Sequence, residues 1–361
     1  MKDAFNPIFS ITPEIAHNLM RIEAARQQVI SLPMNPTVLR SLRETAKLHT
    51  THYSTMIEGN RLTEQQVQEV LLLDKHIPEK ERDEREVKGF YEALELVERY
   101  AKEIKPITEK QLQTLHAVVM AGGNTRVKPT PYRTGQNVIR NGHSGTIVYM
   151  PPEAKDVPLL MKVLVAWISH SDAPSPLVAA VAHYQFATIH PYYDGNGRTA
   201  RLLATLILHV GGYDLKGLYS LEEYYAKDLQ AYYDAITIGP SHNYYMGRAE
   251  ADITTWIAYF IEGMAIACEK VIKQMTKAQE AGLQDHEQSM RTLDPKQRKA
   301  LELFKQYRVI TNAQLAEFLG FTLRSSAALC KKWVNEGFLQ VVNPSFKART
   351  YTLAVPYEKL V

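Results

Sequence analysis

Two apolar runs of the chain enclose the stretch His190-Pro191-Tyr192-Tyr193-Asp194-Gly195-Asn196-Gly197-Arg198-Thr199-Ala200-Arg201. Residues 176–189 precede it, and residues 202–208, which follow it, contain only Leu, Ala, Thr and Ile. Apolar segments of this kind predict buried helices. We therefore expect a loop between two helices, with the second helix beginning where the loop ends.

The residue types in this loop are those of an anion site. Gly195 and Gly197 let the backbone adopt a positive φ and approach a ligand closely. The N–H groups that open the next helix have no partner within it, and they lie at the positive end of its dipole. Arg198 and Arg201 are three residues apart, so they share a helix face, and guanidinium groups match phosphate oxygens. The loop is therefore predicted to hold a polyphosphate.

Two further side chains supply chemistry. Asp194 lies beside the expected phosphates and is a natural ligand for Mg²⁺, which takes one or two carboxylates plus phosphate oxygens. His190 is the side chain of the stretch that can act as a base near neutral pH. A base, a metal ligand and a phosphate clamp together indicate phosphoryl or nucleotidyl transfer.

A plain turn, a structural histidine and two other glycine-rich phosphate motifs are alternative interpretations of this loop. A Gly-Asn-Gly sequence is often only a turn, and a single histidine is usually structural, but here six such features occur in register. No Lys-Ser/Thr follows the glycines, which excludes a P-loop, and no strand precedes them, which excludes a dinucleotide-binding fingerprint.

The stretch resembles the signature of the Fic family, His-Pro-Phe-x-Asp/Glu-Gly-Asn-Gly-Arg-x-x-Arg. The departure is Tyr192, where the family usually has Phe; the ring is kept, but its hydroxyl needs a place. The resemblance implies a protein adenylyltransferase, which transfers AMP from ATP to a Ser, Thr or Tyr hydroxyl of a protein (AMPylation) and releases pyrophosphate. His190 would be the catalytic base and Asp194 the Mg²⁺ ligand.

A second motif ends the helix predicted for residues 37–57. It reads Ser54-Thr55-Met56-Ile57-Glu58-Gly59-Asn60, and Gly59 is a plausible helix stop. By itself it indicates a capped surface helix with an exposed Glu58. It also resembles the inhibitory motif, here Ser54, Glu58 and Gly59, that some Fic proteins carry before the catalytic core. The resemblance implies that Glu58 pairs with Arg201 and occupies the guanidinium fork that the γ-phosphate needs.

Residues 132–139 and 145–149 predict two short strands about a turn at Asn141-Gly142. A plain hairpin would satisfy this pattern. The resemblance implies the flap of Fic proteins, which pairs with an extended segment of the target. The expected target contacts are Ile147, Val148 and Tyr149.

Residues 222–236 predict helix with aromatic packing, and the resemblance places a nucleobase pocket there. Lys227 stands where many family members have Asn, and Tyr232 is the candidate to stack on the base. His116 and His183, on other predicted helices, are assigned to packing. The expected nucleotide-binding residues are Glu58, His190, Gly195, Asn196, Gly197, Arg198, Thr199, Ala200, Arg201, Lys227 and Tyr232.

Composition is ordinary for a globular protein. The 361 residues are 45% hydrophobic and 22% charged, with a net charge of +3, which is too small to indicate a nucleic-acid or membrane partner for the whole chain. Cys268 and Cys330 are expected to be reduced, buried thiols. We find no signal peptide and no run near the ~18 apolar residues of a membrane span, so we expect a cytoplasmic protein without a membrane partner.

The expected fold is mainly α: a Fic (Fido) helical bundle with a small β-hairpin flap, plus a C-terminal winged-helix domain. We expect a helical region carrying the inhibitory motif at 1–105, the catalytic core at 106–280, a linker at 281–294 and the winged helix at 295–361. Three predicted helices and two strands resemble a winged helix, which places its third helix in DNA. Its cations, which a solvated face would also explain, are Arg324, Lys331, Lys332, Lys347 and Arg349.

The resemblance thus implies ATP as substrate, Mg²⁺, and a target protein with an acceptor hydroxyl. The chain itself is a second expected target, and we expect a homodimer. Two alternatives stay open. In the first, the protein would be a DNA-binding regulator whose Fic-like part senses nucleotide. In the second, it would remove AMP from proteins, with Glu58 activating water.

Overall fold

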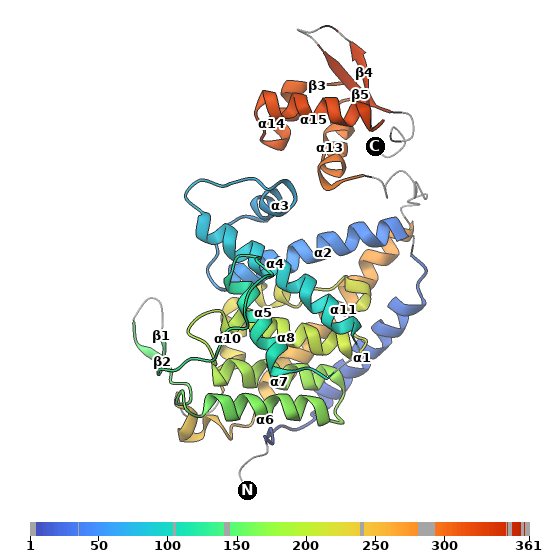
Figure 1. The fold of residues 1–361 in the computed structure, drawn as a ribbon. Helices are drawn as coiled ribbons and strands as arrows, with labels where there is room; N and C mark the ends of the chain where they lie inside the picture. The colour runs from blue at the N-terminus through green and yellow to red at the C-terminus, as the bar shows by residue number, and fades with distance from the viewer. Residues whose placement is uncertain are drawn as a thin grey trace. The chain divides into compact units, whose positions relative to one another are not determined.

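The computed structural model describes residues 5–34, 36–103, 106–140, 145–238, 242–280, 293–343, 345, 349–354 and 357. The described chain is mainly helical with few strands, as the sequence predicts (Figure 1). It forms two compact units that cut across the expected domain boundaries. Unit 1 comprises Met1–Pro33, Leu42–Val67 and Pro78–Lys277, and unit 2 comprises Met34–Ser41, Gln68–Ile77 and Ala278–Val361.

The centre of unit 1 is a pair of helices, α7 (Ser175–Ile189) and α8 (Asn196–Val210), that pack closely on each other. Nearly every residue of α7 is buried, because the helix is apolar on all sides. Helix α4 (Glu81–Lys102) packs on α8 and on α5 (Glu109–Met120), and α6 (Val157–His170) packs on α7. The loop between α7 and α8 is therefore fixed at both ends by buried helices.

Other elements surround this pair. They are α1 (Pro13–Ser31), α2 (Pro36–Ile57), the first part of α3 (Glu64–Leu73), α9 (Glu222–Lys227), α10 (Leu229–Ile236), α11 (Thr254–Glu280) and the short turns η1 (Leu215–Gly217) and η2 (Tyr244–Arg248). Strands β1 (Ile139–Arg140) and β2 (Ile147–Tyr149) pair antiparallel, with Ile139 opposite Tyr149. The first strand is shorter than the predicted 132–139, and the predicted turn at Asn141-Gly142 lies outside the described residues.

Unit 2 contains α13 (Pro295–Gln306), β3 (Ile310–Thr311), α14 (Asn312–Leu319), α15 (Leu323–Asn335), β4 (Leu339–Asn343) and β5 (Thr350–Leu353). The strands form one antiparallel sheet in the order β3-β5-β4. Thr311 and Thr322 cap α14 and α15. The sequence did not predict β3. Most of the predicted linker and Lys347 lie outside the described residues, and the role of a winged helix stays a prediction.

A separate apolar core holds unit 2 together. Trp333 and Phe338 lie at its centre with rings 5.2 Å apart, and Leu73 from the end of α3 is buried in the same core. The sequence analysis assigned α3 to the N-terminal region and missed this contact, since nothing local marks which core a leucine joins. Cys268 and Cys330 are both buried and free, as expected. No helix among the described residues has the length and apolarity to span a membrane.

Candidate active site

The signature loop is held in shape by its own side chains. His190 ends α7 in a left-handed conformation with φ 53° and ψ 59°, and Gly195 precedes α8 with φ 74°. The Asn196 side chain accepts from Tyr192 N at 2.9 Å and donates to Tyr192 O at 2.8 Å. The side-chain oxygen and one side-chain N–H of Asn196 are thus used within the loop, where they hold its shape.

His116 of α5 supports the loop from below. Its Nε2 lies 2.9 Å from Asp194 O, and its ring stacks on Tyr192 with ring centroids 3.6 Å apart. Burial lowers the pKa of His116 to about 4. The packing role assigned from the sequence is therefore confirmed for His116. His183 also packs inside the protein, where its Nε2 lies 3.1 Å from the Tyr232 hydroxyl.

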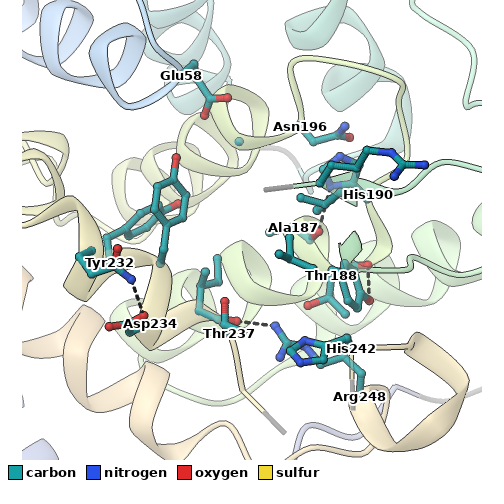
Figure 2. Close-up of a pocket in the computed structure, with 18 residues that line it drawn as sticks. Glu58, Ala187, Thr188, His190, Asn196, Tyr232, Asp234, Thr237, His242 and Arg248 are labelled. Carbon is teal, nitrogen blue, oxygen red and sulfur yellow. Dashed lines mark hydrogen bonds between the residues drawn. The ribbon is translucent and has the colours of Figure 1, made fainter. Parts of the chain in front are cut away.

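His190 is poised as a neutral base. Its Nδ1 lies 3.3 Å from Ala187 O, and a carbonyl oxygen can only accept, so Nδ1 carries the hydrogen and Nε2 keeps its lone pair. Burial, and to a smaller extent the charge of Arg133, lowers the pKa of His190 to about 4. At neutral pH the imidazole is therefore uncharged, and it lines the main cavity (Figure 2).

Arg133, which the sequence analysis passed over, ties the loop to the segment before the flap. Its buried guanidinium donates to His190 O at 2.9 Å, to Gly135 O at 3.0 Å and to Pro152 O. Its backbone N–H donates to Pro191 O at 2.9 Å. One of these four bonds holds the carbonyl of the left-handed His190 and another holds that of Pro191, so Arg133 orients the base without lining the cavity.

Arg201 is fully buried and makes the contact expected with the inhibitory motif. Its Nη2 donates to Glu58 Oε1 at 2.8 Å and to Ser54 O at 2.8 Å, and its Nε donates to Ser54 Oγ at 2.7 Å. A Cβ on Gly197 would lie 2.2 Å from Glu58 Oε1, so glycine is what lets this carboxylate approach the start of α8. Gly59 follows with φ 88°, as a helix stop requires.

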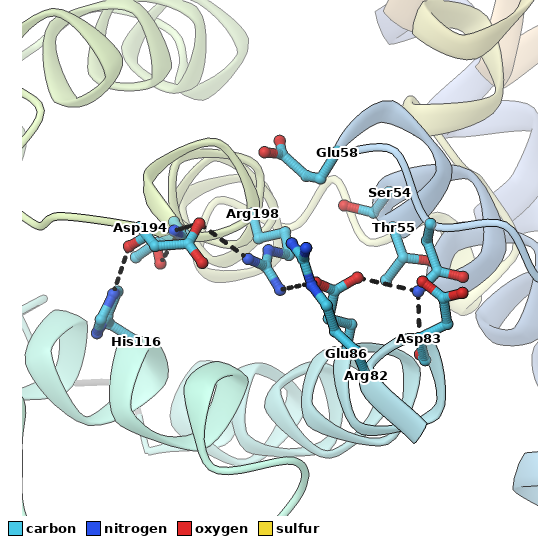
Figure 3. A network of polar contacts seen from close by, with 12 residues as sticks. Ser54, Thr55, Glu58, Arg82, Asp83, Glu86, His116, Asp194 and Arg198 are labelled. Carbon is cyan, nitrogen blue, oxygen red and sulfur yellow. Dashed lines mark hydrogen bonds and ion pairs between the residues drawn. The ribbon is translucent and has the colours of Figure 1, made fainter. Parts of the chain in front are cut away.

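A second polar network surrounds Arg198 (Figure 3). Its Nη2 lies 3.3 Å from Asp194 Oδ1, which also accepts from Gly195 N at 2.6 Å. On the other side, Nη1 lies 4.0 Å from Glu86 Oε1, and Glu86 accepts from Asn60 Nδ2 at 3.0 Å. Helix α4 begins at Glu81 and turns the Glu86 side chain, which is 12% exposed, toward Arg198.

Two guanidinium nitrogens at the start of α8 lack a hydrogen-bond partner in the described part of the chain. Arg198 Nε and Arg201 Nη1 are buried without a hydrogen-bond partner among the described residues. Arg201 Nη1 lies 3.3 Å from the position of a Cβ on Gly197, that is, beside the N-terminus of α8. Buried donors are nearly always satisfied, and these two carry positive charge beside a helix N-terminus, so they are candidates to bind an anionic ligand.

A cavity of about 620 Å³ lies along the end of α7 and the start of α8, within the volume range of small-molecule sites. Glu58 lies at the opposite end from His242 and Arg248 (Figure 2). The wall residues include Glu58, Val148, Tyr149, Thr188, His190, Asn196, Gly197, Gln230, Tyr232, Tyr233, Asp234, Thr237, His242 and Arg248.

Some expected nucleotide-binding residues lie away from this cavity. Lys227 has a side chain 64% exposed and pairs with Glu223 at 3.4 Å, so it does not line the cavity. Thr199 and Ala200 are buried, and Thr199 Oγ1 bonds to Gly195 O at 2.8 Å. These two side chains support α8 from behind, because successive helix residues face different sides.

The aromatic side of the cavity also differs from expectation. Tyr232 lines it but is only 3% exposed, because its ring packs among other aromatic rings and its hydroxyl meets His183. Tyr233, the next residue, is 44% exposed and presents more of its ring. Tyr232 was the candidate to stack on the base, and nothing in the sequence tells which of the two adjacent rings is open.

The flap residues divide in the same way. Ile147 is exposed and Val148 is half-buried at the cavity. The Tyr149 side chain is buried, and its hydroxyl donates to Thr188 O at 2.9 Å. Strand alternation puts Tyr149 on the anchoring face together with Ile147, but only Tyr149 reaches the bundle. A target contact through the Tyr149 side chain is therefore not supported.

The chain is similar to known proteins over the region of this site. Residues 106–208 match the model of the Fic/DOC family. Proteins named "Protein adenylyltransferase Fic" from Drosophila persimilis and Drosophila melanogaster are each 31% identical over 199 residues, or 54% of this chain. The match spans only 38% and 39% of those relatives, so the chain covers under two fifths of their length.

Solved structures show the same fold. A Fic family protein from Desulfovibrio desulfuricans G20 superposes with a TM-score of 0.63 at 22% identity, covering 97% of this chain and 99% of that chain. Fic-1 from C. elegans superposes with a TM-score of 0.58 at 24% identity, covering 74% of this chain and 73% of that one.

Proposed function

Because residues 106–208 of this chain match the Fic/DOC family, we propose that the protein is an adenylyltransferase that moves AMP from ATP to a hydroxyl of a target protein. The observation that carries the proposal is a pair of buried donors in the first turns of α8, Arg198 Nε and Arg201 Nη1, that find no hydrogen-bond partner in the described part of the chain. Arg201 Nη1 lies beside Gly197, and both Gly197 and His190 line the cavity. A phosphate chain satisfies the donors and brings a phosphorus atom toward the base.

The proposed reaction balances as follows. His190 Nε2 takes the proton from the acceptor hydroxyl of a Ser, Thr or Tyr. That oxygen forms a bond to the α-phosphorus, and the bond between this phosphorus and the bridging oxygen to the β-phosphate breaks, releasing pyrophosphate. Arg198, Arg201 and the N–H groups that open α8 hold the negative charge of the leaving group. Positioning and charge stabilisation supply most of the rate enhancement in such transfers.

The residues around Asp194 fit Mg²⁺ when nucleotide is present. The Asp194 side chain is 58% exposed, and no hydrogen bond to its Oδ2 is made by the described residues. No group of three or more metal-binding side chains occurs within the described ranges, so phosphate oxygens would have to complete the shell. When bound, Mg²⁺ neutralises charge on the phosphates. Asp194 would hold it, with its carboxylate oriented by Gly195 N–H and Arg198.

Glu58 is proposed to keep this site in a resting state. Its carboxylate accepts a hydrogen bond from Arg201 Nη2. It also fills the space beside Gly197 at the N-terminus of α8, where a Cβ on that residue would lie only 2.2 Å from Glu58 Oε1. An anionic phosphate cannot occupy the same place without repulsion from the carboxylate. Removal of Glu58 should therefore raise both ATP affinity and transfer.

A second activity of the same site is supported by the position of Glu58 on the cavity wall. A carboxylate there is placed to activate water, which would remove AMP from a modified protein. An AMP-labelled target that loses its label faster with the wild type than with Glu58→Gln would favour this activity.

The DNA-binding alternative rests on unit 2. Arg324, Lys331 and Lys332 of α15 are exposed, although Lys332 also lies 3.6 Å from Glu336. Exposed cations on a helix suit phosphate contacts. Retention on duplex DNA that weakens uniformly in an Arg324→Gln, Lys331→Gln double variant would support this role.

The deciding experiment uses α-³²P-labelled ATP with Mg²⁺ and cell lysate. We expect faint protein labelling by the wild type, strong labelling by Glu58→Gly, and none by the Glu58→Gly, His190→Ala double variant. Glu58→Gln, which keeps the shape but loses the charge, should lie between the first two. Equal labelling by wild type and Glu58→Gly would remove the inhibitory role alone. Absence of label from every variant would sink the transferase.

A further inference from the structure

The C-terminus of α2 leaves four backbone carbonyls without partners inside the helix, as every helix does. All four find partners in unit 1. Thr55 O accepts from Glu58 N and Asn60 N, and Met56 O accepts from Gly59 N at 2.9 Å. Those bonds are local to the turn that Gly59 makes. The remaining two carbonyls, of Ser54 and Ile57, are capped by side chains from distant parts of the chain.

Both of these distant caps belong to the cavity region. Arg201 Nη2 caps Ser54 O at 2.8 Å. The Tyr233 hydroxyl donates to Ile57 O at 3.1 Å, across 176 residues of sequence. Ile57 directly precedes Glu58, so the Tyr233 bond fixes the backbone from which the Glu58 carboxylate projects.

Tyr233 contacts the cavity through its ring and the end of α2 through its hydroxyl. Its ring lines the cavity and is 44% exposed, so a bound nucleotide would touch it. Its hydroxyl is occupied by α2. Burial, and to a smaller extent the charge of Glu58, raises the pKa of the Tyr233 phenol, which keeps it a donor at neutral pH.

We propose that Tyr233 is a second latch on the inhibitory helix: its hydroxyl holds the Ile57 carbonyl while its ring forms the cavity wall. The inference rests on the proposed function and deepens its regulation. Nucleotide that shifts the backbone of Glu58 also strains the bond between Tyr233 and Ile57, because the two contacts are made by consecutive residues. Glu58 blocks by charge, whereas Tyr233 acts as a positioning residue that keeps Glu58 in place.

Tyr233→Phe tests the latch, since it keeps the ring and removes only the hydroxyl. One neutral hydrogen bond corresponds to about a 2- to 10-fold change in an equilibrium. With Glu58 present, we expect Tyr233→Phe to raise labelling and to tighten ATP binding by about that factor. The Glu58→Gly background has no inhibitory carboxylate to keep in place. There we expect Tyr233→Phe to match its parent in labelling and in ATP affinity.

Tyr213→Phe is the matched control. It removes one hydroxyl from a hydrogen bond of 3.1 Å to Glu23, and neither residue lines the cavity. It should match its parent in labelling and in ATP affinity. Thermal unfolding of each variant reports any general loss of structure, which would lower labelling in both backgrounds.

The outcomes separate the two proposals. A fall in ATP affinity with Tyr233→Phe in both backgrounds would overturn the latch and assign the hydroxyl to the nucleotide. The latch would also be overturned if Tyr233→Phe matched its parent in labelling and in ATP affinity in both backgrounds. If Glu58→Gly labels no protein, the transferase proposal fails, and calorimetric ATP affinity still decides the latch by the same comparison.

Discussion

Tyr192 brings a hydroxyl into a place that the fold keeps apolar. The ring is 2% exposed and stacks on His116, so it supports the loop as phenylalanine would. Its hydroxyl, however, is buried without a partner among the residues described here. The sequence analysis raised the question of where this hydroxyl goes, and the structure gives it no hydrogen bond.

Tyr192→Phe should therefore be stabilising or neutral. Removing a buried, unsatisfied hydroxyl relieves a desolvation cost of about 1–3 kcal/mol, against the loss of a few contacts. We expect the free energy of unfolding to rise by about 1 kcal/mol in denaturant titration, with labelling by the Glu58→Gly parent unchanged. A decrease of 1 kcal/mol or more would show that an ordered water satisfies the hydroxyl.

His190 provides the second test at this scale. Its pKa is lowered to about 4, first by burial and then by the Arg133 cation, so the base form predominates throughout the neutral range. The sign follows from the lowered value: activity is present above the folded pKa and is lost as the pH falls through it. We expect kcat/KM of Glu58→Gly to be flat from about pH 5.5 to 7.5.

Direct titration of the His190 imidazole by NMR, assigned with His190→Ala, should give a midpoint near 4, not near the ordinary 6.5. A midpoint above 6 would mean that water enters the cavity and solvates the imidazolium. Arg133→Gln in the same experiment should move the midpoint upward, because one nearby positive charge is removed.

At the scale of elements, the site depends on ties between segments that are far apart in sequence. Arg133 joins the segment before β1 to the end of α7, and Tyr149 joins β2 to α7 through Thr188 O. Glu86 and Asn60 connect α4, the end of α2 and the start of α8. Each tie is a hydrogen bond to a backbone or a buried charge, which sequence spacing cannot reveal.

Arg133→Lys tests the hydrogen bonds of the Arg133 guanidinium while keeping a long, positively charged side chain at this position. A lysine ammonium cannot reach three carbonyls as the guanidinium fork does. We expect the free energy of unfolding to fall by about 2 kcal/mol and labelling by the Glu58→Gly parent to fall at least ~10-fold, with a smaller change in ATP affinity. Arg126→Lys, at an exposed position, is the control. Unchanged labelling in Arg133→Lys would show that the orientation of His190 does not depend on this residue.

At the scale of the whole molecule, the chain builds two cores. The core of unit 1 surrounds α7 and α8, whereas Trp333, Phe338 and their neighbours form the core of unit 2. The cavity and every proposed catalytic or nucleotide-binding residue described above belong to unit 1. Helices α2 and α3 contribute residues to both units.

Two cores predict two unfolding transitions in calorimetry. Ligand that binds only the native state raises the stability of the unit that binds it, by RT ln(1 + [L]/Kd). We expect ATP with Mg²⁺ to raise the transition of unit 1 in Glu58→Gly and to leave that of unit 2 in place, with the wild type responding less. A single transition that moves as one would show that the two cores unfold cooperatively.

The amino-acid sequence alone was enough to predict the mainly helical fold and the loop between two apolar helices. It could do so because the twelve residues His190 to Arg201 are contiguous, and because helix caps such as Thr108, Thr311 and Thr322 act within one turn. Contacts of this kind need no knowledge of distant segments.

Only the tertiary structure decided which side chains face the cavity and what holds them. Tyr232 and Tyr233 are adjacent in sequence, yet packing buries one ring and leaves the other open. Arg133, Glu86 and the Tyr233 hydroxyl act through partners 26 to 176 residues away, such as Asn60, His190 and Ile57. Long-range pairing of buried polar groups depends on how helices pack, and hydrophobic periodicity carries no record of it.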